Sequence, residues 1–178
     1  MDLNVAGLKH YSVVDGPGVR TAVFLQGCPH LCPGCHNPQT QDFAGGRWLN
    51  VAALAAEIAA DRRVRGVTFS GGEPFAQAEP LVMLAEILKK AGCHLLIYSG
   101  YTYEQLKEKA SSDNATAALL AAGDLLIDGP FLLAERDISL TYRGSRNQRI
   151  IDLPASLQLG SPVLSPLHFC GQGQSNGC

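Results

Sequence analysis

Strand-like and helix-like segments alternate along the middle of this 178-residue chain, and this alternation limits the possible folds more than any other feature. Apolar runs of strand length stand at 21–27, 66–70, 93–98 and 124–128. Amphipathic stretches with the helical period stand at 49–63, 77–91, 103–110 and 115–122. Such alternation is typical of βαβ units, whose strands pair in parallel.

These segments predict an α/β fold built on an open, partial (β/α) barrel of mostly parallel strands. A fifth candidate strand lies at 149–153. A closed eight-fold barrel takes about 250 residues, more than this chain has, so we expect the sheet to stay open. We expect one domain over residues 1–158, followed by a flexible C-terminal tail over 159–178 that ends in a stretch rich in Gly, Gln and Ser.

The composition excludes several classes of protein. Hydrophobic residues make up 46% and charged residues 17% of the chain, as in ordinary globular proteins. The net charge of −2 argues against a large nucleic-acid surface, which is normally basic. No stretch approaches the ~20 apolar residues of a membrane-spanning helix, and the first residues lack a signal-peptide core. We therefore expect a cytoplasmic protein that binds neither nucleic acids nor membranes.

Three cysteines are concentrated in one loop, in the order Cys28-x3-Cys32-x2-Cys35, directly after the apolar run 21–27. We call residues 28–35 the cysteine loop. Such close spacing does not suit disulfides between distant segments and indicates a metal site. Three thiolates can hold a 4Fe–4S cluster and leave one iron open, whereas electron-transfer clusters usually have four protein thiolates. The alternative is a zinc site with His30 or His36 as the fourth ligand.

Glycines follow the next strands where their carboxyl ends should meet. The sequence Ser-Gly-Gly-Glu-Pro occupies 70–74, and the pairs Ser99-Gly100 and Asp128-Gly129 follow the later strands. Glycines at such positions let a ligand approach the backbone, although a simple strand-to-helix turn would use the same residues. Because the carboxyl ends of parallel strands share one edge, we expect these segments and the cysteine loop to converge on one rim.

The order of these motifs resembles that of radical S-adenosylmethionine enzymes, and more narrowly that of the glycyl-radical activases. The segments Asp-Gly-Pro-Gly-Val-Arg at 15–20 and Cys-His-Asn-Pro at 35–38 are similar to theirs. Within that group the chain most resembles the anaerobic ribonucleoside-triphosphate reductase-activating proteins. The narrower resemblance rests on the short chain and on Gly34, 98–101, 126–129 and 143–150. It covers about residues 10–153.

The resemblance implies a radical-SAM type of partial barrel and a set of cofactor contacts. Cys28, Cys32 and Cys35 would ligate one 4Fe–4S cluster, and S-adenosylmethionine would chelate its open iron. The backbone of 70–73 would hold the methionine amine, whereas the residues after the later strands would hold ribose and carboxylate, and His36 would pack near adenine. The expected contacts are His36, Ser70, Gly71, Gly72, Glu73, Ser99, Gly100 and Asp128.

The reaction is implied by the same resemblance. A reduced cluster would pass one electron to S-adenosylmethionine, and the resulting 5′-deoxyadenosyl radical would take a hydrogen from a glycine of an anaerobic ribonucleotide reductase. A flavodoxin or ferredoxin would donate the electron. No catalytic side chain is expected, because the cofactors carry the chemistry. The alternatives are an activase of the pyruvate formate-lyase type, a small-molecule radical-SAM synthase and a zinc-binding module.

Several residues outside these motifs keep more than one interpretation. Arg143, Arg146 and Arg149 flank a Gly-Ser turn, and they would dock a partner, shield the radical site or simply face solvent. Cys170 and Cys178 are expected to be free thiols in the tail. His30 lies inside the cysteine loop, close enough to tune a cluster through hydrogen bonding.

Overall fold

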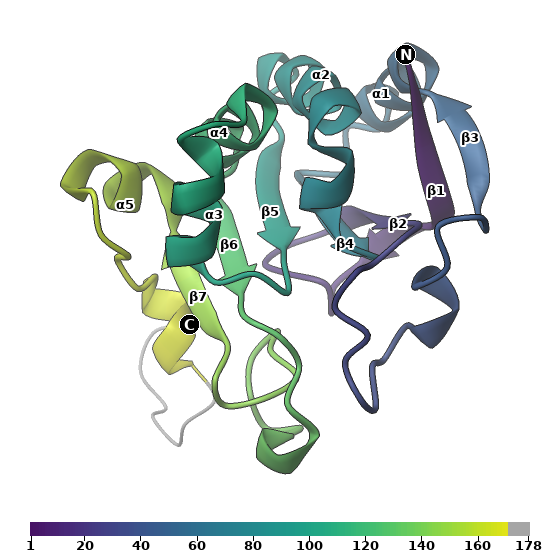
Figure 1. The fold of residues 1–178 in the computed structure, drawn as a ribbon. Coiled ribbons are helices and arrows are strands. Elements are labelled where there is room, and N and C mark those ends of the chain that lie inside the picture. Colours follow the sequence, from purple (N-terminus) through teal and green to yellow (C-terminus); the bar gives the residue numbers. More distant parts are fainter. Residues whose placement is uncertain (171–178) are drawn as a thin grey trace.

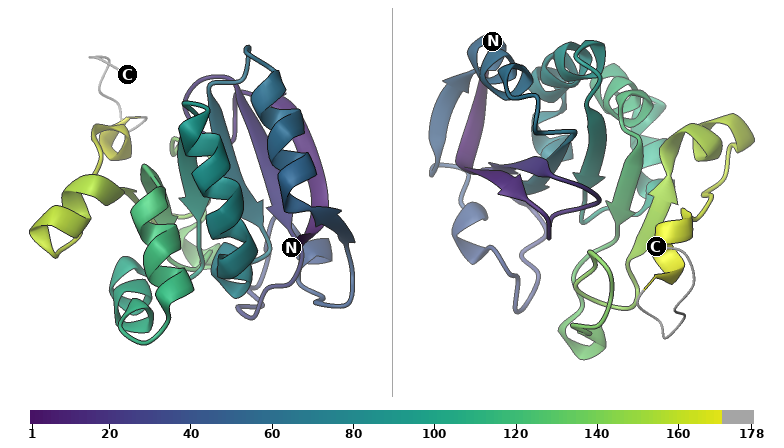
Figure 2. Two further views of the ribbon diagram at one scale, coloured as in Figure 1. Left: turned by 90° about the horizontal axis from the view of Figure 1, so that it is seen from above. Right: turned by 180° about the vertical axis from the view of Figure 1, so that it is seen from behind.

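The computed structural model describes residues 1–170, which form one seven-stranded sheet with helices along one face (Figures 1 and 2). The strand order is β3-β1-β2-β4-β5-β6-β7. The four central strands are parallel: β2 (Arg20–Leu25), β4 (Gly66–Gly71), β5 (His94–Tyr98) and β6 (Leu125–Asp128). The sheet is open, with β3 and β7 at its two edges, and this confirms the α/β class.

Four helices connect the parallel strands, as the alternation predicts: α1 (Val51–Ala60), α2 (Ala78–Lys90), α3 (Tyr103–Ala110) and α4 (Asn114–Ala122). Asn50 caps the start of α1, because its side chain accepts from the amide of Ala53. Helix α1 ends at Ala60, three residues before the predicted end. Within residues 1–170, no helix has both the length and the apolar character needed to cross a membrane.

The edges of the sheet differ from the prediction. Strands β1 (Asp2–Ser12) and β3 (Arg47–Asn50) were not expected, and both pair antiparallel. Two register shifts interrupt the pairing of β1 with β2, so its apolar residues do not alternate regularly. Strand β7 (Arg149–Asp152) fills the predicted fifth position but runs antiparallel to β6. The segment between β6 and β7 holds only the short 3-10 helix η3 (Leu133–Glu135), not the α-helix that usually makes a parallel crossover.

The described part of the expected tail, residues 159–170, contains secondary structure and backbone contacts with β7. After α5 (Leu153–Leu159) the chain returns along β7, where the amide of Ser165 donates to the carbonyl of Ile150 at 2.8 Å. The 3-10 helix η4 (Pro166–Phe169) follows. These contacts form because the outer edge of β7 offers unpaired backbone groups. The rest of the predicted tail lies outside the described residues.

One cysteine near the C-terminus differs from the prediction. Cys170 is buried and disulfide-bonded, so the expectation of a free thiol at this position is wrong. The expectation was based on the reducing conditions of the cytoplasm, but the compartment alone does not determine whether an individual cysteine is oxidised. Cys178 lies outside the described residues.

The two faces of the sheet carry different cores because side chains alternate along each strand. On β5, Leu95 and Ile97 belong to the large core beneath the helices, whereas Leu96 belongs to a smaller core on the other face. On β6, Leu126 faces the helices, and Ile127 faces the smaller core. Loops gather at the carboxyl ends of the parallel strands, toward the lower edge of Figure 1.

Candidate functional site

A cleft of about 510 Å³ lies at the carboxyl ends of the parallel strands. The cysteine loop, the ends of β4 and β5, and the 129–148 loop after β6 all contribute to its walls. The structure brings nine of the eleven predicted site residues to this cleft: Cys28, Cys32, Cys35, His36, Ser70, Gly71, Gly72, Ser99 and Gly100. Glu73 and Asp128 are the two that do not line it.

The cysteine loop is fixed at its base by backbone hydrogen bonds. The amides of Gly27 and Cys28 donate to the carbonyls of Thr40 and Gln41 at 2.8 and 3.1 Å. Gly27 has a φ of +92°, and a Cβ there would come within 2.4 Å of the Phe43 ring, so only glycine fits at this turn. The loop thus leaves β2 on a defined path and delivers its thiols to the cleft.

The surroundings of the thiols affect their protonation in opposite directions. The amide of Asn37 donates to the sulfur of Cys35 at 3.4 Å, a contact that stabilises a negative sulfur. Burial raises the pKa of the Cys28 thiol, although the backbone amide of His30 acts in the opposite direction. A metal that binds Cys28 must therefore displace a proton.

The donor set fits a 4Fe–4S cluster better than a single zinc ion. Zinc ligands lie about 2.0–2.3 Å from one centre, so they must gather tightly. Among residues 1–170, no three His, Cys, Asp or Glu side chains are grouped closely enough to hold one ion. The corners of a cubane are separate iron atoms, so its thiolates stand farther apart. Cys28, Cys32 and Cys35 all line the cleft, and three thiolates are the number that leaves one iron of such a cluster open.

Gly71 and Gly72 are required by a close approach of two backbones. A Cβ on Gly71, whose φ is +87°, would lie 2.7 Å from the amide nitrogen of Leu25, and one on Gly72 would lie 2.3 Å from the carbonyl oxygen of Gly27. The amide of Gly72 donates to Leu25 and that of Glu73 donates to Gly27, both at 2.8 Å. The end of β4 is thereby joined to the start of the cysteine loop, with its backbone beside the thiols.

Glu73 lies behind the cleft wall and is fully buried. Its carboxylate accepts from the Ser99 hydroxyl at 3.0 Å and from the amides of Gly100 and Phe75 at 2.9 and 3.0 Å. His30 is a further partner, with Nε2 at 2.8 Å. The side chain therefore orders the strand ends that surround the cleft, and only the backbone of Glu73 remains as the predicted cofactor contact.

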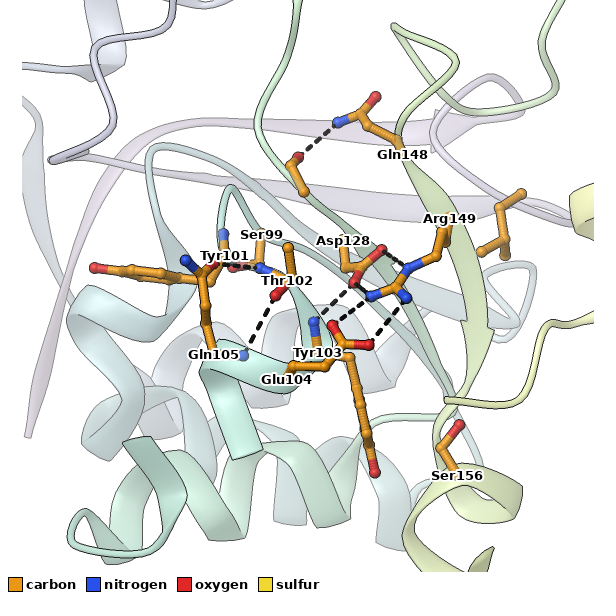
Figure 3. A network of polar contacts seen from close by, with 12 residues as sticks. Ser99, Tyr101, Thr102, Tyr103, Glu104, Gln105, Asp128, Gln148, Arg149 and Ser156 are labelled. Carbon is orange, nitrogen blue, oxygen red and sulfur yellow. Dashed lines mark hydrogen bonds and ion pairs between the residues drawn. The ribbon is translucent and has the colours of Figure 1, made fainter. Parts of the chain in front are cut away.

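Asp128 does not line the cleft. Figure 3 shows its carboxylate directed toward the guanidinium of Arg149. Alternation along β6 places it on the helix side of the sheet with Leu126, where its carboxylate accepts from the amide of Tyr103 at 2.7 Å and from the guanidinium of Arg149. Arg149 also donates to Glu104 at 2.7 and 3.0 Å. Asp128 thus joins the start of α3 to β7, and the structure does not bring it to the predicted ribose or carboxylate position.

The other two arginines of the 143–150 motif also differ in their surroundings. Arg143 is buried, and it donates to the carbonyls of Gln148 and His168 at 3.3 and 2.7 Å. Arg146 remains 59% exposed and lies 3.8 Å from Asp137. Only Arg146 has the surroundings that a solvated or partner-docking arginine would need.

Sequence reasoning pointed to Arg143, which lines the cleft from the 129–148 loop, but missed the apolar and aromatic residues of this loop. Phe131, Leu140 and Tyr142 line the cleft from this loop, and Tyr98 lines it from β5. Gln148 fixes the loop, because its side chain accepts from the amide of Gly144 at 2.8 Å and donates to the carbonyl of Gly129 at 3.1 Å. The alternation on β5 was a usable signal for Tyr98. The loop residues carried none, because their positions depend on non-local contacts.

The ion pair between Arg149 and Glu104 makes stability depend on pH. The hydrogen bond from Arg149 lowers the pKa of Glu104 from 4.5 to about 2. A depressed pKa contributes stability that is present above 4.5 and is lost as the pH falls toward 2. We therefore expect Glu104→Gln to lower the urea midpoint of the cluster-free protein above pH 4.5 but not near pH 2. Glu108→Gln, an exposed position on the same helix, is the control; equal effects of both variants would contradict this assignment.

Comparisons with known proteins agree with this site. A family model described as a 4Fe–4S single cluster domain matches residues 14–151. The anaerobic ribonucleoside-triphosphate reductase-activating protein of Vibrio cholerae is 35% identical over 146 residues, which cover 78% of this chain and 90% of that protein. The protein of the same name from Haemophilus influenzae is 32% identical over 154 residues, covering 80% and 95% of the two chains.

A third relative has a different name. The pyruvate formate-lyase-activating enzyme of Clostridium pasteurianum is 40% identical over 110 residues. These cover 58% of this chain and 46% of that enzyme, so the similarity spans less than half of the longer protein. Fold, cleft and family model together define a protein of the single-cluster 4Fe–4S class. Within it, the chain belongs to the family of anaerobic ribonucleoside-triphosphate reductase-activating proteins, radical-SAM activases, which confirms the resemblance seen in the sequence.

Proposed function

We propose that this protein uses one 4Fe–4S cluster and S-adenosylmethionine to generate a glycyl radical on an anaerobic ribonucleoside-triphosphate reductase. One observation carries the proposal: three thiols from the cysteine loop and the glycine-rich ends of β4 and β5 line a single cleft. The names of the relatives from Vibrio cholerae and Haemophilus influenzae supply the reductase as the partner.

The residues of the cleft have distinct tasks in this proposal. Cys28, Cys32 and Cys35 hold the cluster, which when bound and reduced supplies the electron that cleaves the sulfonium of S-adenosylmethionine. The backbone of 70–73 binds the methionine amine, and Ser99, Gly100 and His36 bind the remainder of the cofactor. The side chains of Phe131, Leu140 and Tyr142 exclude water from the reacting groups, so that a reactive radical meets the substrate glycine before it meets solvent.

Further parts of the proposal concern the setting of the reaction. A flavodoxin or ferredoxin reduces the cluster. An external donor is proposed because the described residues offer three cleft thiols, whereas an electron-transfer cluster of the protein's own would usually use four. The protein acts in the cytoplasm, because thiolate ligands need a reducing compartment. The open sheet is a partial (β/α) barrel of radical-SAM type, a description supported by four parallel strands whose carboxyl ends meet at the cleft.

An anaerobic assay of the wild-type protein tests the proposal. After reconstitution with iron and sulfide and reduction with dithionite, we expect conversion of S-adenosylmethionine to methionine and 5′-deoxyadenosine. The protein is then mixed separately with an anaerobic ribonucleotide reductase and with pyruvate formate-lyase, and glycyl-radical EPR signals are compared. A signal on the reductase alone supports the stated partner, and a signal on the lyase alone would replace it. A protein with a full cluster that yields no 5′-deoxyadenosine would refute the reaction.

A further inference from the structure

The side chain of His30 crosses from the cysteine loop to the ends of the neighbouring strands. Its Nε2 lies 2.8 Å from Oε2 of Glu73. A carboxylate only accepts, so Nε2 carries the hydrogen and donates it. The imidazole also packs edge-on against the ring of Tyr101, with the ring centroids 4.4 Å apart and the planes at 73°. Two contacts thus hold the middle of a loop whose base is fixed at Gly27 and Cys28.

Glu73 makes this contact relevant to the whole cleft. Its buried carboxylate also accepts from Ser99, Gly100 and Phe75, so it joins the cysteine loop to the ends of both β4 and β5. A carboxylate excluded from water needs such donors, and the loss of one leaves part of its charge uncompensated. The position of His30 is therefore strongly determined by the strand ends.

Two details show that the surroundings are shaped around His30. A Cβ on Gly100 would come within 2.3 Å of Cδ2 of the imidazole, so the absence of a side chain at Gly100 makes room for the ring. Burial raises the pKa of the Cys28 thiol, and the backbone amide of His30, close to its sulfur, acts in the opposite direction. One residue is thus tied through its ring to the strand ends and through its backbone to a cluster ligand.

We propose that His30 is a positioning residue, whose imidazole, anchored on Glu73, fixes the three thiols relative to the cofactor-binding ends of β4 and β5. This inference rests on the proposed function, because it concerns how the cluster ligands are held against the cofactor segments. Without the anchor the three thiols and the ends of β4 and β5 are still present, but the loop is free to shift between its ends. Outer partners of metal ligands typically change affinity or activity by about 10- to 100-fold.

A matched pair of substitutions tests the anchor. In His30→Gln the side-chain amide still reaches Glu73 and donates, whereas in His30→Asn the amide is too short to do so. Wild type and variants are reconstituted anaerobically to equal iron content, and the dissociation constant of S-adenosylmethionine is measured by equilibrium dialysis. We expect His30→Asn to raise that constant about 10-fold or more. His30→Gln should stay within about threefold of wild type, because it keeps the hydrogen bond.

The EPR spectrum of the reduced cluster gives a second measurement. Addition of S-adenosylmethionine should change this spectrum in wild type and in His30→Gln, but much less in His30→Asn. The control is His10→Ala on β1, a histidine that is 41% exposed, lies 3.5 Å from Glu57 and does not line the cleft. If His30→Asn does not take up the cluster while His30→Gln does, that difference in iron content supports the anchor equally.

Two results would overturn the inference. One is wild-type affinity and an unchanged EPR response in His30→Asn; the other is a defect in His30→Gln as large as that in His30→Asn. Both differ from failure of the proposed function, in which the wild-type protein itself holds a cluster but neither binds nor cleaves S-adenosylmethionine.

Discussion

Replacing Cys32 by alanine is expected to abolish the cleavage of S-adenosylmethionine completely. Cys32 is the middle thiol of the cysteine loop, and its loss would leave only Cys28 and Cys35 to hold the cluster. Two thiolates do not retain a 4Fe–4S cluster that needs three, so iron and sulfide content should fall with activity. The measurement is iron, sulfide and 5′-deoxyadenosine on the same anaerobic preparations.

Cys93→Ala is the matched control for this prediction. Cys93 is a free, buried cysteine beside the start of β5, and it does not line the cleft. Removal of its sulfur should cost about 1 kcal/mol of stability, the typical effect of a single core substitution. Iron content and cleavage should stay at the wild-type level. Equal loss of iron in both variants would mean that the cysteine loop does not provide the cluster ligands.

The central βαβ pattern could be predicted because its signals are local. Helix α3 occupies the predicted residues, and a capping box at Thr102 and Gln105 fixes its start through bonds within four residues of the chain. Strand β1 escaped prediction because two register shifts in its pairing with β2 disrupt its alternation. Strand β3 depends on pairing with β1 across more than 40 residues, as at Leu3 and Leu49. Sequence periodicity contains no direct record of such pairing.

The candidate site shows the same division between local and non-local information. The thiols and the glycines of β4 and β5 were identified from spacing, and the parallel pairing then brings them together. Asp128 was expected in the cleft from the resemblance alone, although the alternation of Leu126 and Ile127 already indicates the helix face for it. The link between His30 and Glu73 spans 43 positions, so no local pattern could have revealed it.

Replacing Arg149 by methionine is expected to destabilise the protein by about 3 kcal/mol. Asp128 is only 1% exposed, so without Arg149 its carboxylate would be a buried charge with one remaining donor, the amide of Tyr103. Breaking a buried ion pair from one side costs about 3–5 kcal/mol, and the lower end applies here because Arg149 is 29% exposed and water can enter. Urea unfolding of the cluster-free protein at neutral pH measures the effect.

Two further variants test whether the loss of stability comes from the buried charge of Asp128 or from the loss of any arginine of the 143–150 motif. Arg146→Met makes the same change three residues earlier, where the side chain is 59% exposed, and should leave the urea midpoint unchanged. Asp128→Asn combined with Arg149→Met removes the buried charge itself while its side-chain oxygen still accepts from Tyr103. We expect this double variant to be more stable than Arg149→Met alone. Such a deviation from the sum of the two single effects is expected for residues that interact directly. An additive double variant would mean that Arg149 acts through packing and not through the carboxylate of Asp128.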